Sequence, residues 1–250
     1  MKTFAVSGLP EIHAGDDLAA LIDDRSDFEA GDVLCLASTV VSKAEGRKAD
    51  LSAFPPSERA ESIAERLESL TGESKDPRFA QAVLEESEEL LIDAPFLLAV
   101  TRFGHITVNA GIDRSNVPDA DLLLLPEAPS ASAERLSEAL GVPVVVTDTS
   151  GRPFRYGQRG VAVGWAGMPA SRDWRGESDR DGRELGVTVQ SVVDELAGAA
   201  NLVAGEGNDG TPAVVVRDWA FGDHAGSDEL FRREEDDIVR EALRQWEFEA

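Results

Sequence analysis

Short apolar runs alternate irregularly with amphipathic stretches along this chain, and that order limits the folds it can form. Strands are predicted where β-branched runs or period-two alternation occur, over residues 3–6, 33–41, 96–101, 105–109, 142–147, 161–165 and 213–217. Helical spacing of apolar residues predicts helices over residues 16–24, 57–70, 77–91, 131–140, 187–204 and 234–246, with Ser57 as an N-cap. Because these elements do not follow a strict strand–helix–strand rhythm, we predict an α+β (mixed α/β) fold rather than a doubly wound sheet.

The charge of the chain is strongly acidic, with 48 Asp and Glu against 24 Lys and Arg and a formal net charge of −24. Such a surface repels nucleic acids and anionic membranes, so neither is expected as a partner. Lysine is scarce: the chain has four lysines and twenty arginines. At about 1 M salt the Debye length is only ~3 Å, so self-repulsion of this size is tolerable there. The composition favours a halophilic archaeal host, and an acidic mesophilic protein is the alternative.

Length and apolar runs bear on compartment and domain organisation. The first ten residues lack the apolar core, roughly 7–15 residues long, of a signal peptide, and no run approaches the ~20 apolar residues of a membrane span. We therefore expect a cytoplasmic protein whose residues 1–250 form one domain, with two intertwined subdomains as a variant of it. The lone cysteine, Cys35, excludes an intramolecular disulfide and is expected in the core.

One stretch of the chain departs from the acidic pattern. Residues 147–183 hold seven arginines and five acids, a net charge of +2; the arginines are Arg152, Arg155, Arg159, Arg172, Arg175, Arg180 and Arg183. Arginines retained in so acidic a chain are expected either to bind an anion or to pair with surface acids. Both interpretations stay open at the level of composition.

Several common nucleotide and nucleophile motifs are missing from the sequence. Residues 205–210 fit G-x-G-x-x-G, but a predicted helix precedes them and a strand follows, which is the wrong context for a dinucleotide fingerprint. The sequence contains neither a P-loop nor a G-x-S-x-G motif, and its three histidines lack metal-ligand spacing. The glycine-rich loop is either a ligand-approaching loop or a plain helix-to-strand turn.

Two polar loops follow predicted strands, over residues 109–118 and 147–159. Asp113 and Asp148 stand at or just beyond the ends of these strands, where open sheets commonly bind ligands. Carboxylate and hydroxyl oxygens suit Mg²⁺ or Mn²⁺, and neighbouring arginines suit phosphate. Each aspartate alone is more typical of a turn or cap. Two such loops together favour a metal–phosphate site.

A series of longer motifs occurs in order along the chain. They are GLPEI at residues 8–12, GDDL at 15–18, STVVSKAEGR at 38–47, NAGIDRSNVP at 109–118, TDT-x-GRP-x-R-x-GQ at 147–158, VAVG-x-AGM at 161–168, RD-x-RG at 172–176 and GREL at 182–185. With these motifs the chain resembles the coenzyme F420-0:L-glutamate ligase (coenzyme F420:gamma-glutamyl ligase) family, in a haloarchaeal-type form. The resemblance covers nearly the whole length and leaves no room for the nitroreductase-like domain of some relatives.

The resemblance implies GTP-dependent addition of L-glutamate to coenzyme F420-0, with release of GDP and phosphate through an acyl phosphate. The number of glutamates added, one or more through γ-linkages, stays open. It implies a homodimer of a gamma-glutamyl ligase-like fold, two Mg²⁺ or Mn²⁺ ions, and K⁺ as a further ion. A non-catalytic GTP- and metal-binding protein, or an amide ligase with another acceptor, is the alternative.

The motifs also imply roles for individual residues. The implied GTP contacts are Leu9, Pro10, Glu11, Ile12, Ser38, Thr39, Lys43, Asn116, Gly205 and Gly207. The implied metal ligands are Asp113, Asp148, Thr149 and Glu206, and Lys43, Arg152 and Arg155 are assigned to the remaining anions as catalytic residues. Ser150 and Phe154 stand where larger aromatics are expected, and Glu206 stands where many relatives carry Lys or Gln.

Overall fold

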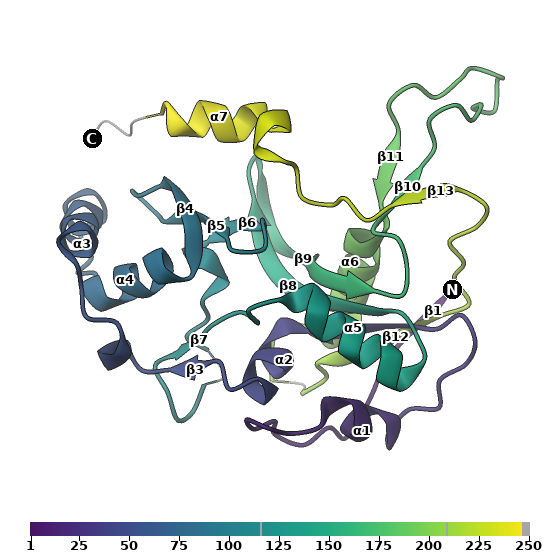
Figure 1. The fold of residues 1–250 in the computed structure, drawn as a ribbon, viewed down its shortest axis with the longest axis horizontal. Coiled ribbons are helices and arrows are strands. Elements are labelled where there is room, and N and C mark those ends of the chain that lie inside the picture. Colours follow the sequence, from purple (N-terminus) through teal and green to yellow (C-terminus); the bar gives the residue numbers. More distant parts are fainter. Residues whose placement is uncertain (116, 209, 247–250) are drawn as a thin grey trace. The chain divides into compact units, whose positions relative to one another are not determined.

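A computed structural model describes residues 1–115, 117–208 and 210–246 of the chain, as two compact units (Figure 1). The first unit combines Met1–Ala44 with Ala128–Leu230, and the second combines Glu45–Glu127 with the segment that starts at Phe231. The second unit is thus an insertion into the first, completed by the C-terminal segment.

A five-stranded mixed sheet forms the centre of the first unit. Its order is β1 (Lys2–Ala5), β12 (Ala213–Arg217), β2 (Val33–Ala37), β8 (Val144–Arg152) and β9 (Arg155–Ala166). Only the β2–β8 pair is parallel, and the other neighbours are antiparallel. A mixed sheet with helices outside a regular crossover pattern confirms the predicted α+β class.

Two helices pack directly against β9. A methyl group added at Gly160 would lie 2.4 Å from the Ala197 carbonyl oxygen of α6 (Val192–Ala204), and one added at Gly164 would lie 2.3 Å from the carbonyl carbon of Pro129 in α5 (Pro129–Leu140). A register shift between these glycines turns the strand so that they face different helices. On the α6 side, β2, β8 and β12 contribute a buried cluster that includes Cys35 and Val145.

The remaining elements of the first unit are short. They are α1 (Leu18–Asp23), α2 (Ser38–Ala44) and a small sheet of β11 (Val189–Ser191), β10 (Ser171–Asp173) and β13 (Ala225–Ser227). Beyond the pairing of Ala37 with Thr147, β9 is the only described strand that pairs with β8, so the two strands continue as an antiparallel hairpin that turns at Pro153 and Phe154. The sequence expectation of a loop over residues 147–159 is therefore wrong.

The second unit packs helices against a three-stranded sheet. The sheet comprises β4 (Ser87–Ile92), β5 (Leu98–Thr101) and β6 (Ile106–Val108), and the helices are α3 (Glu58–Thr71) and α4 (Pro77–Glu85). Smaller elements are η1 (Leu51–Ala53), η2 (Asn109–Gly111), and the pair of β3 (Lys48–Ala49) with β7 (Leu122–Leu123). Apolar side chains of these elements form their own buried cluster, which includes Leu67, Val83 and Leu122. Ser57 caps α3 as predicted, because its hydroxyl accepts from the Ala60 amide.

The C-terminal segment is tied to the second unit by arginines. It forms η3 (Glu234–Asp236) and α7 (Ile238–Arg244). Glu89 of β4 accepts hydrogen bonds from Arg240, at 2.6 Å, and from Arg244. These hydrogen bonds, from Arg244 above all, hold the pKa of Glu89 below its ordinary value.

Several predicted element boundaries are wrong. The helix predicted over residues 234–246 is divided at Asp237 into η3 and α7. The strand predicted over residues 33–41 stops at Ala37, and α2 follows, because burial of Val40 and Val41 outweighs their β propensity. The helix predicted over residues 77–91 ends at Glu85, since the next residues pair with β5. The helix predicted over residues 187–204 begins only at Val192, because Val189–Ser191 pairs with β10. Within the described residues, no helix has the length and apolar character that a bilayer crossing requires.

Candidate functional site

Helix α2 brings two of the predicted site residues to their partners in the first unit. Lys43 lies in its last turn with 8% of the side chain exposed, and its ammonium donates a 2.6 Å hydrogen bond to Oε1 of Glu11. Glu11 lies in the loop after β1, and that loop is also held to α2 by a hydrogen bond from the Gly15 amide to the Ala44 carbonyl. The GLPEI loop and the STVVSK helix, remote in sequence, therefore meet through a buried cation.

At the other end of α2, Ser38 is buried and points to β8. Its hydroxyl donates to Oδ1 of Asp148 at 3.3 Å. The parallel pairing of Ala37 with Thr147 explains this contact, because the residue after each partner continues from the same sheet edge. The structure thus joins two predicted residues, one assigned to GTP and one to metal.

Thr149 faces a different partner. Its hydroxyl donates to Oε1 of Glu206 at 3.2 Å, and Glu206 also accepts a 2.7 Å hydrogen bond from Nδ2 of Asn201. Consecutive strand residues project to opposite faces of a sheet, so Thr149 shares the α6 face with Val145 whereas Asp148 occupies the other face. Glu206 follows the end of α6 in the glycine-rich loop, between Gly205 and Gly207.

These contacts give two pairs of hard oxygen donors, Asp148 with Ser38 and Glu206 with Thr149. One carboxylate and one hydroxyl each suit Mg²⁺ or Mn²⁺, which are often bound through one or two carboxylates, waters and substrate phosphates. Among the described residues no group of three or more His, Cys, Asp or Glu is gathered as an all-protein metal cage. The donor set therefore fits a cation that shares its coordination with a phosphate-bearing substrate.

The other predicted metal ligand, Asp113, belongs to the second unit. Its carboxylate accepts from the Ser115 amide at 2.7 Å and from the Ser115 hydroxyl, and its backbone bridges Leu123. This is the geometry of a turn-stabilising aspartate. Metal binding by Asp113 stays a prediction, and Asn116 lies outside the described residues.

The other predicted GTP contacts lie in the first unit. Leu9, Pro10 and Ile12 share the loop that carries Glu11, and only Ile12 of these three is fully buried. Thr39 lies in the first turn of α2, half-buried. Gly205 and Gly207 are exposed on the α6–β12 loop. This loop joins a helix to a strand, as the sequence predicted.

The arginines of the net-positive stretch divide into two groups. Arg172 is enclosed by aromatic rings, with its guanidinium carbon 5.0 Å from the Phe221 ring centroid and 5.4 Å from that of Trp219. Arg175 pairs with Asp173, and this hydrogen bonding lowers the pKa of Asp173 to about 2. Arg175 therefore supports the ion-pair interpretation, whereas Arg172 is held by aromatic rings and by the Ala220 carbonyl, to which its Nη2 donates.

The second group lies on the β8–β9 hairpin and comprises Arg152, Arg155 and Arg159. Arg152 pairs in register with Arg155, and Ser150 pairs with Arg159. Arg155 and Arg159 are exposed and Arg152 is half-buried. Such side chains are accessible to an anion, so the anion interpretation stays a prediction for the hairpin.

Cys35 takes no part in this site. It is buried in β2, and burial raises the pKa of its thiol to about 12. A thiol with so high a pKa forms almost no thiolate near neutral pH, which excludes a nucleophilic role and confirms the core assignment.

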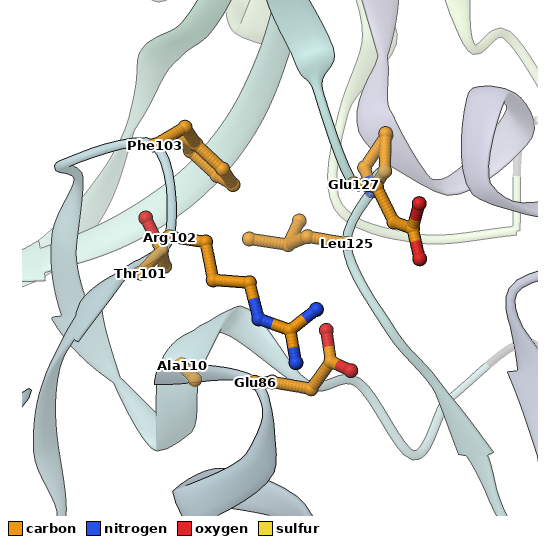
Figure 2. Close-up of a pocket in the computed structure, with 8 residues that line it drawn as sticks. Glu86, Thr101, Arg102, Phe103, Ala110, Leu125 and Glu127 are labelled. Carbon is orange, nitrogen blue, oxygen red and sulfur yellow. The ribbon is translucent and has the colours of Figure 1, made fainter. Parts of the chain in front are cut away.

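A small open pocket lies within the second unit (Figure 2). Figure 2 shows the guanidinium of Arg102 pointing toward the carboxylate of Glu86. The lining residues are Glu86, Thr101, Arg102, Phe103, Ala110, Leu125, Pro126 and Glu127. None of them is a predicted site residue, and Glu86 is already paired with Arg47. The pocket therefore does not define the candidate site.

Comparisons with known proteins agree with the motif order. The family model for F420-0:Gamma-glutamyl ligase matches residues 8–218. The chain is similar to the coenzyme F420:L-glutamate ligase of Natronomonas pharaonis, with 82% identity over 249 residues, covering 100% of this chain and 98% of that protein. It is 72% identical over 250 residues to the enzyme of that name from Halorubrum lacusprofundi, with 100% of both chains covered. It is 66% identical over 251 residues to the enzyme of that name from Halobacterium salinarum, with 100% of this chain and 99% of that protein covered.

Proposed function

The chain belongs to the F420-0:gamma-glutamyl ligase family, and on that premise we propose that it adds L-glutamate to coenzyme F420-0 with GTP as the phosphoryl donor. The observation that carries the proposal is the set of contacts Lys43–Glu11, Ser38–Asp148 and Thr149–Glu206. They join motifs from four separate parts of the sequence within the first unit. A buried cation and two carboxylate–hydroxyl pairs suit a phosphate-bearing substrate.

Amide formation from a carboxylate requires activation, because an oxide ion is a poor leaving group. We propose that a carboxylate oxygen of F420-0 attacks the γ-phosphorus of GTP, the bond from this phosphorus to the bridging oxygen breaks, and GDP leaves. The glutamate amine then attacks the acyl carbon of the resulting acyl phosphate and expels phosphate, while the amine proton passes to a base. Both steps bring anions together, so cationic groups must offset their repulsion.

The chain's own residues divide this work in the proposal. Lys43 binds a nucleotide phosphate. To do so, its ammonium must share its hydrogen bonds between that phosphate and Glu11. Arg152 and Arg155 bind the remaining anions from the hairpin. Asp148, Thr149 and Glu206 hold divalent cations, which supply charge neutralisation when bound. Asp113 and K⁺ remain further parts of the same proposal.

Two surface features extend the proposal to assembly. Phe154 and Tyr156 at the hairpin tip are fully exposed. Exposed aromatic side chains are enriched where proteins associate, so we propose that the hairpin contributes to a homodimer. Sedimentation velocity of a Phe154→Ser/Tyr156→Ser double variant should show a larger monomer fraction than the parent chain. If the double variant dimerises as the parent chain does, the hairpin does not contribute to the dimer interface.

The activity is tested by product analysis in molar KCl with GTP, L-glutamate, F420-0 and Mn²⁺. Mass spectrometry should show F420-0 increased in mass by one glutamate residue, and GDP release should require both acceptor and glutamate. With ¹⁸O in the acceptor carboxylate, one ¹⁸O should appear in the released phosphate, as the acyl-phosphate route demands. Asp148→Asn should lose turnover by at least about 100-fold while keeping its melting temperature.

Other results would replace the proposal with one of its alternatives. GTP and metal binding without any acceptor-dependent GDP release would indicate a non-catalytic binding protein. Amide formation with another carboxylic acid, but not with F420-0, would indicate a different ligase. Near-parental turnover in Asp148→Asn would contradict the assigned role of that carboxylate.

A further inference from the structure

Asn201, on the last full turn of α6, contacts the candidate site but lies outside the sequence motifs from which residue roles are predicted. Its Nδ2 donates to Oε1 of Glu206 at 2.7 Å, the shorter of the two contacts made to that oxygen, since the Thr149 hydroxyl lies 3.2 Å away. We propose that Asn201 is a positioning residue that orients the Glu206 carboxylate toward β8 for a divalent cation. The inference rests on the proposed function only in taking Glu206 as a metal ligand.

The position of Asn201 follows from the packing of α6 on β9. Gly160 is the direct partner of Thr149, and a methyl group there would lie 2.4 Å from the Ala197 carbonyl oxygen and 2.9 Å from Cβ of Asn201. Helix residues four apart share a face, so Ala197 and Asn201 both face this strand. The missing side chain at Gly160 thus lets the end of α6 lie close to the hairpin, so that the local pair of Asn201 and Glu206 meets Thr149.

The first turn of α6 is fixed to the same strand. Asp194 accepts a 2.9 Å hydrogen bond from the backbone amide of Ala162 and another of 2.9 Å from the Ser191 hydroxyl. Ala162 adjoins the register shift in the β8–β9 pairing, where an amide is released from the ladder. With both ends of α6 held against β9, Asn201 is a rigid donor.

Glu206 itself needs such a donor. It is exposed and flanked by Gly205 and Gly207, whose backbones have wide conformational freedom. A long carboxylate in that setting loses much rotamer freedom when it is held for a cation. The Asn201 amide restricts it through Oε1, and Oε2, which lies 3.4 Å from the Thr149 hydroxyl, is the oxygen that would bind a metal beside that hydroxyl. Because the amide is neutral, it does not repel the cation.

The test is direct Mn²⁺ binding to the substrate-free protein in molar KCl, with free Mn²⁺ measured by electron paramagnetic resonance. Asn201→Ala and the similarly shaped Asn201→Leu should each weaken the tightest Mn²⁺ site about 10-fold. Glu206→Ala should weaken it at least as much. Leu202→Ala is the matched control, because Leu202 is the next residue on the same helix and is 86% exposed; it should leave the affinity unchanged.

A double-mutant cycle separates positioning from a general structural effect. If Asn201 acts through Glu206, adding Asn201→Ala to Glu206→Ala should cause no further loss of Mn²⁺ affinity. Full additivity of the two losses, or parental affinity in both Asn201 variants, would overturn the inference. Parental affinity in Glu206→Ala would instead show that Glu206 is not a ligand, which removes its metal assignment and the inference together but leaves the assignment of Asp148 standing.

Discussion

Thr149 of β8 and Gly160 of β9 are direct partners in the hairpin, and the absent side chain at Gly160 is what lets α6 lie against the strand. Glycine is not needed at position 160 for a positive φ angle, because Gly160 is not among the glycines with positive φ. It is needed because α6 fills the space that a side chain would occupy on this face of β9. One predicted metal ligand therefore depends on a glycine on the neighbouring strand.

The first prediction concerns that glycine. Gly160→Ala should lower the free energy of unfolding by about 1–3 kcal/mol, because the added methyl group meets helix backbone and α6 must shift. Gly151→Ala on the same hairpin is the control, since a methyl group there meets nothing within 4 Å. Urea denaturation at fixed salt measures both. Equal stability of the two variants would contradict the packing argument.

The second prediction uses the unequal exposure of Lys43 and Glu11, whose side chains are 8% and 54% exposed. Glu11→Gln should destabilise by about 1–3 kcal/mol, because a buried ammonium loses its carboxylate. Lys43→Met should cost less than about 1 kcal/mol, because the exposed carboxylate that remains is solvated. Denaturant titration of both variants decides the order, and a larger loss in Lys43→Met would refute it.

The third prediction concerns acid stability. Buried Asp32 accepts from Nε and Nη2 of Arg217 at 2.9 and 2.7 Å, and these hydrogen bonds hold its pKa below the ordinary value. A pKa lowered by folding adds stability above the unfolded pKa of about 3.9, which is lost as pH falls through the folded value. Asp32→Asn should therefore melt below the parent at pH 7, with the gap narrowing below about pH 4. A gap that is constant from pH 7 to pH 3 would argue against this linkage.

The fourth prediction follows from the net charge of −24. Raising KCl from about 0.1 M to above 1 M shortens the Debye length from ~10 Å to ~3 Å and weakens the repulsion among carboxylates. The melting temperature should rise by roughly 10 °C or more, which corresponds to a few kcal/mol for a chain of this size. Betaine of equal osmolarity is the uncharged control. A melting temperature independent of KCl would end the halophilic interpretation.

The sequence predicts the fold well where a local pattern is strong. The strand over residues 213–217 has the predicted bounds, and Ser57 caps α3 as expected. The error at Val40 and Val41 arises because these β-branched residues are buried in a helix, so tertiary packing outweighs their local preference for a strand. Strands of two or three residues, such as β3 and β7, are too short to produce a pattern.

Prediction of the site divides in the same way. Lys43, Asp148 and Thr149 lie in continuous motifs, so the sequence indicates them, although it does not show that Asp148 and Thr149 face opposite sides of a strand. Asn201 carries no such signal, because a polar residue near the end of a helix is typical of a solvated face. Its role becomes visible only through the register that places Gly160 opposite Thr149.

The strand order β1-β12-β2 has a consequence for biosynthesis. The two N-terminal strands do not touch each other in the ladder; each pairs with β12, which is translated more than 170 residues after β2. A nascent chain that has not yet passed Arg217 can pair β2 with β8 but leaves β1 without its neighbour. Termination before that residue therefore yields an open sheet edge, and Arg217 must be translated before β1 has its complete partner strand.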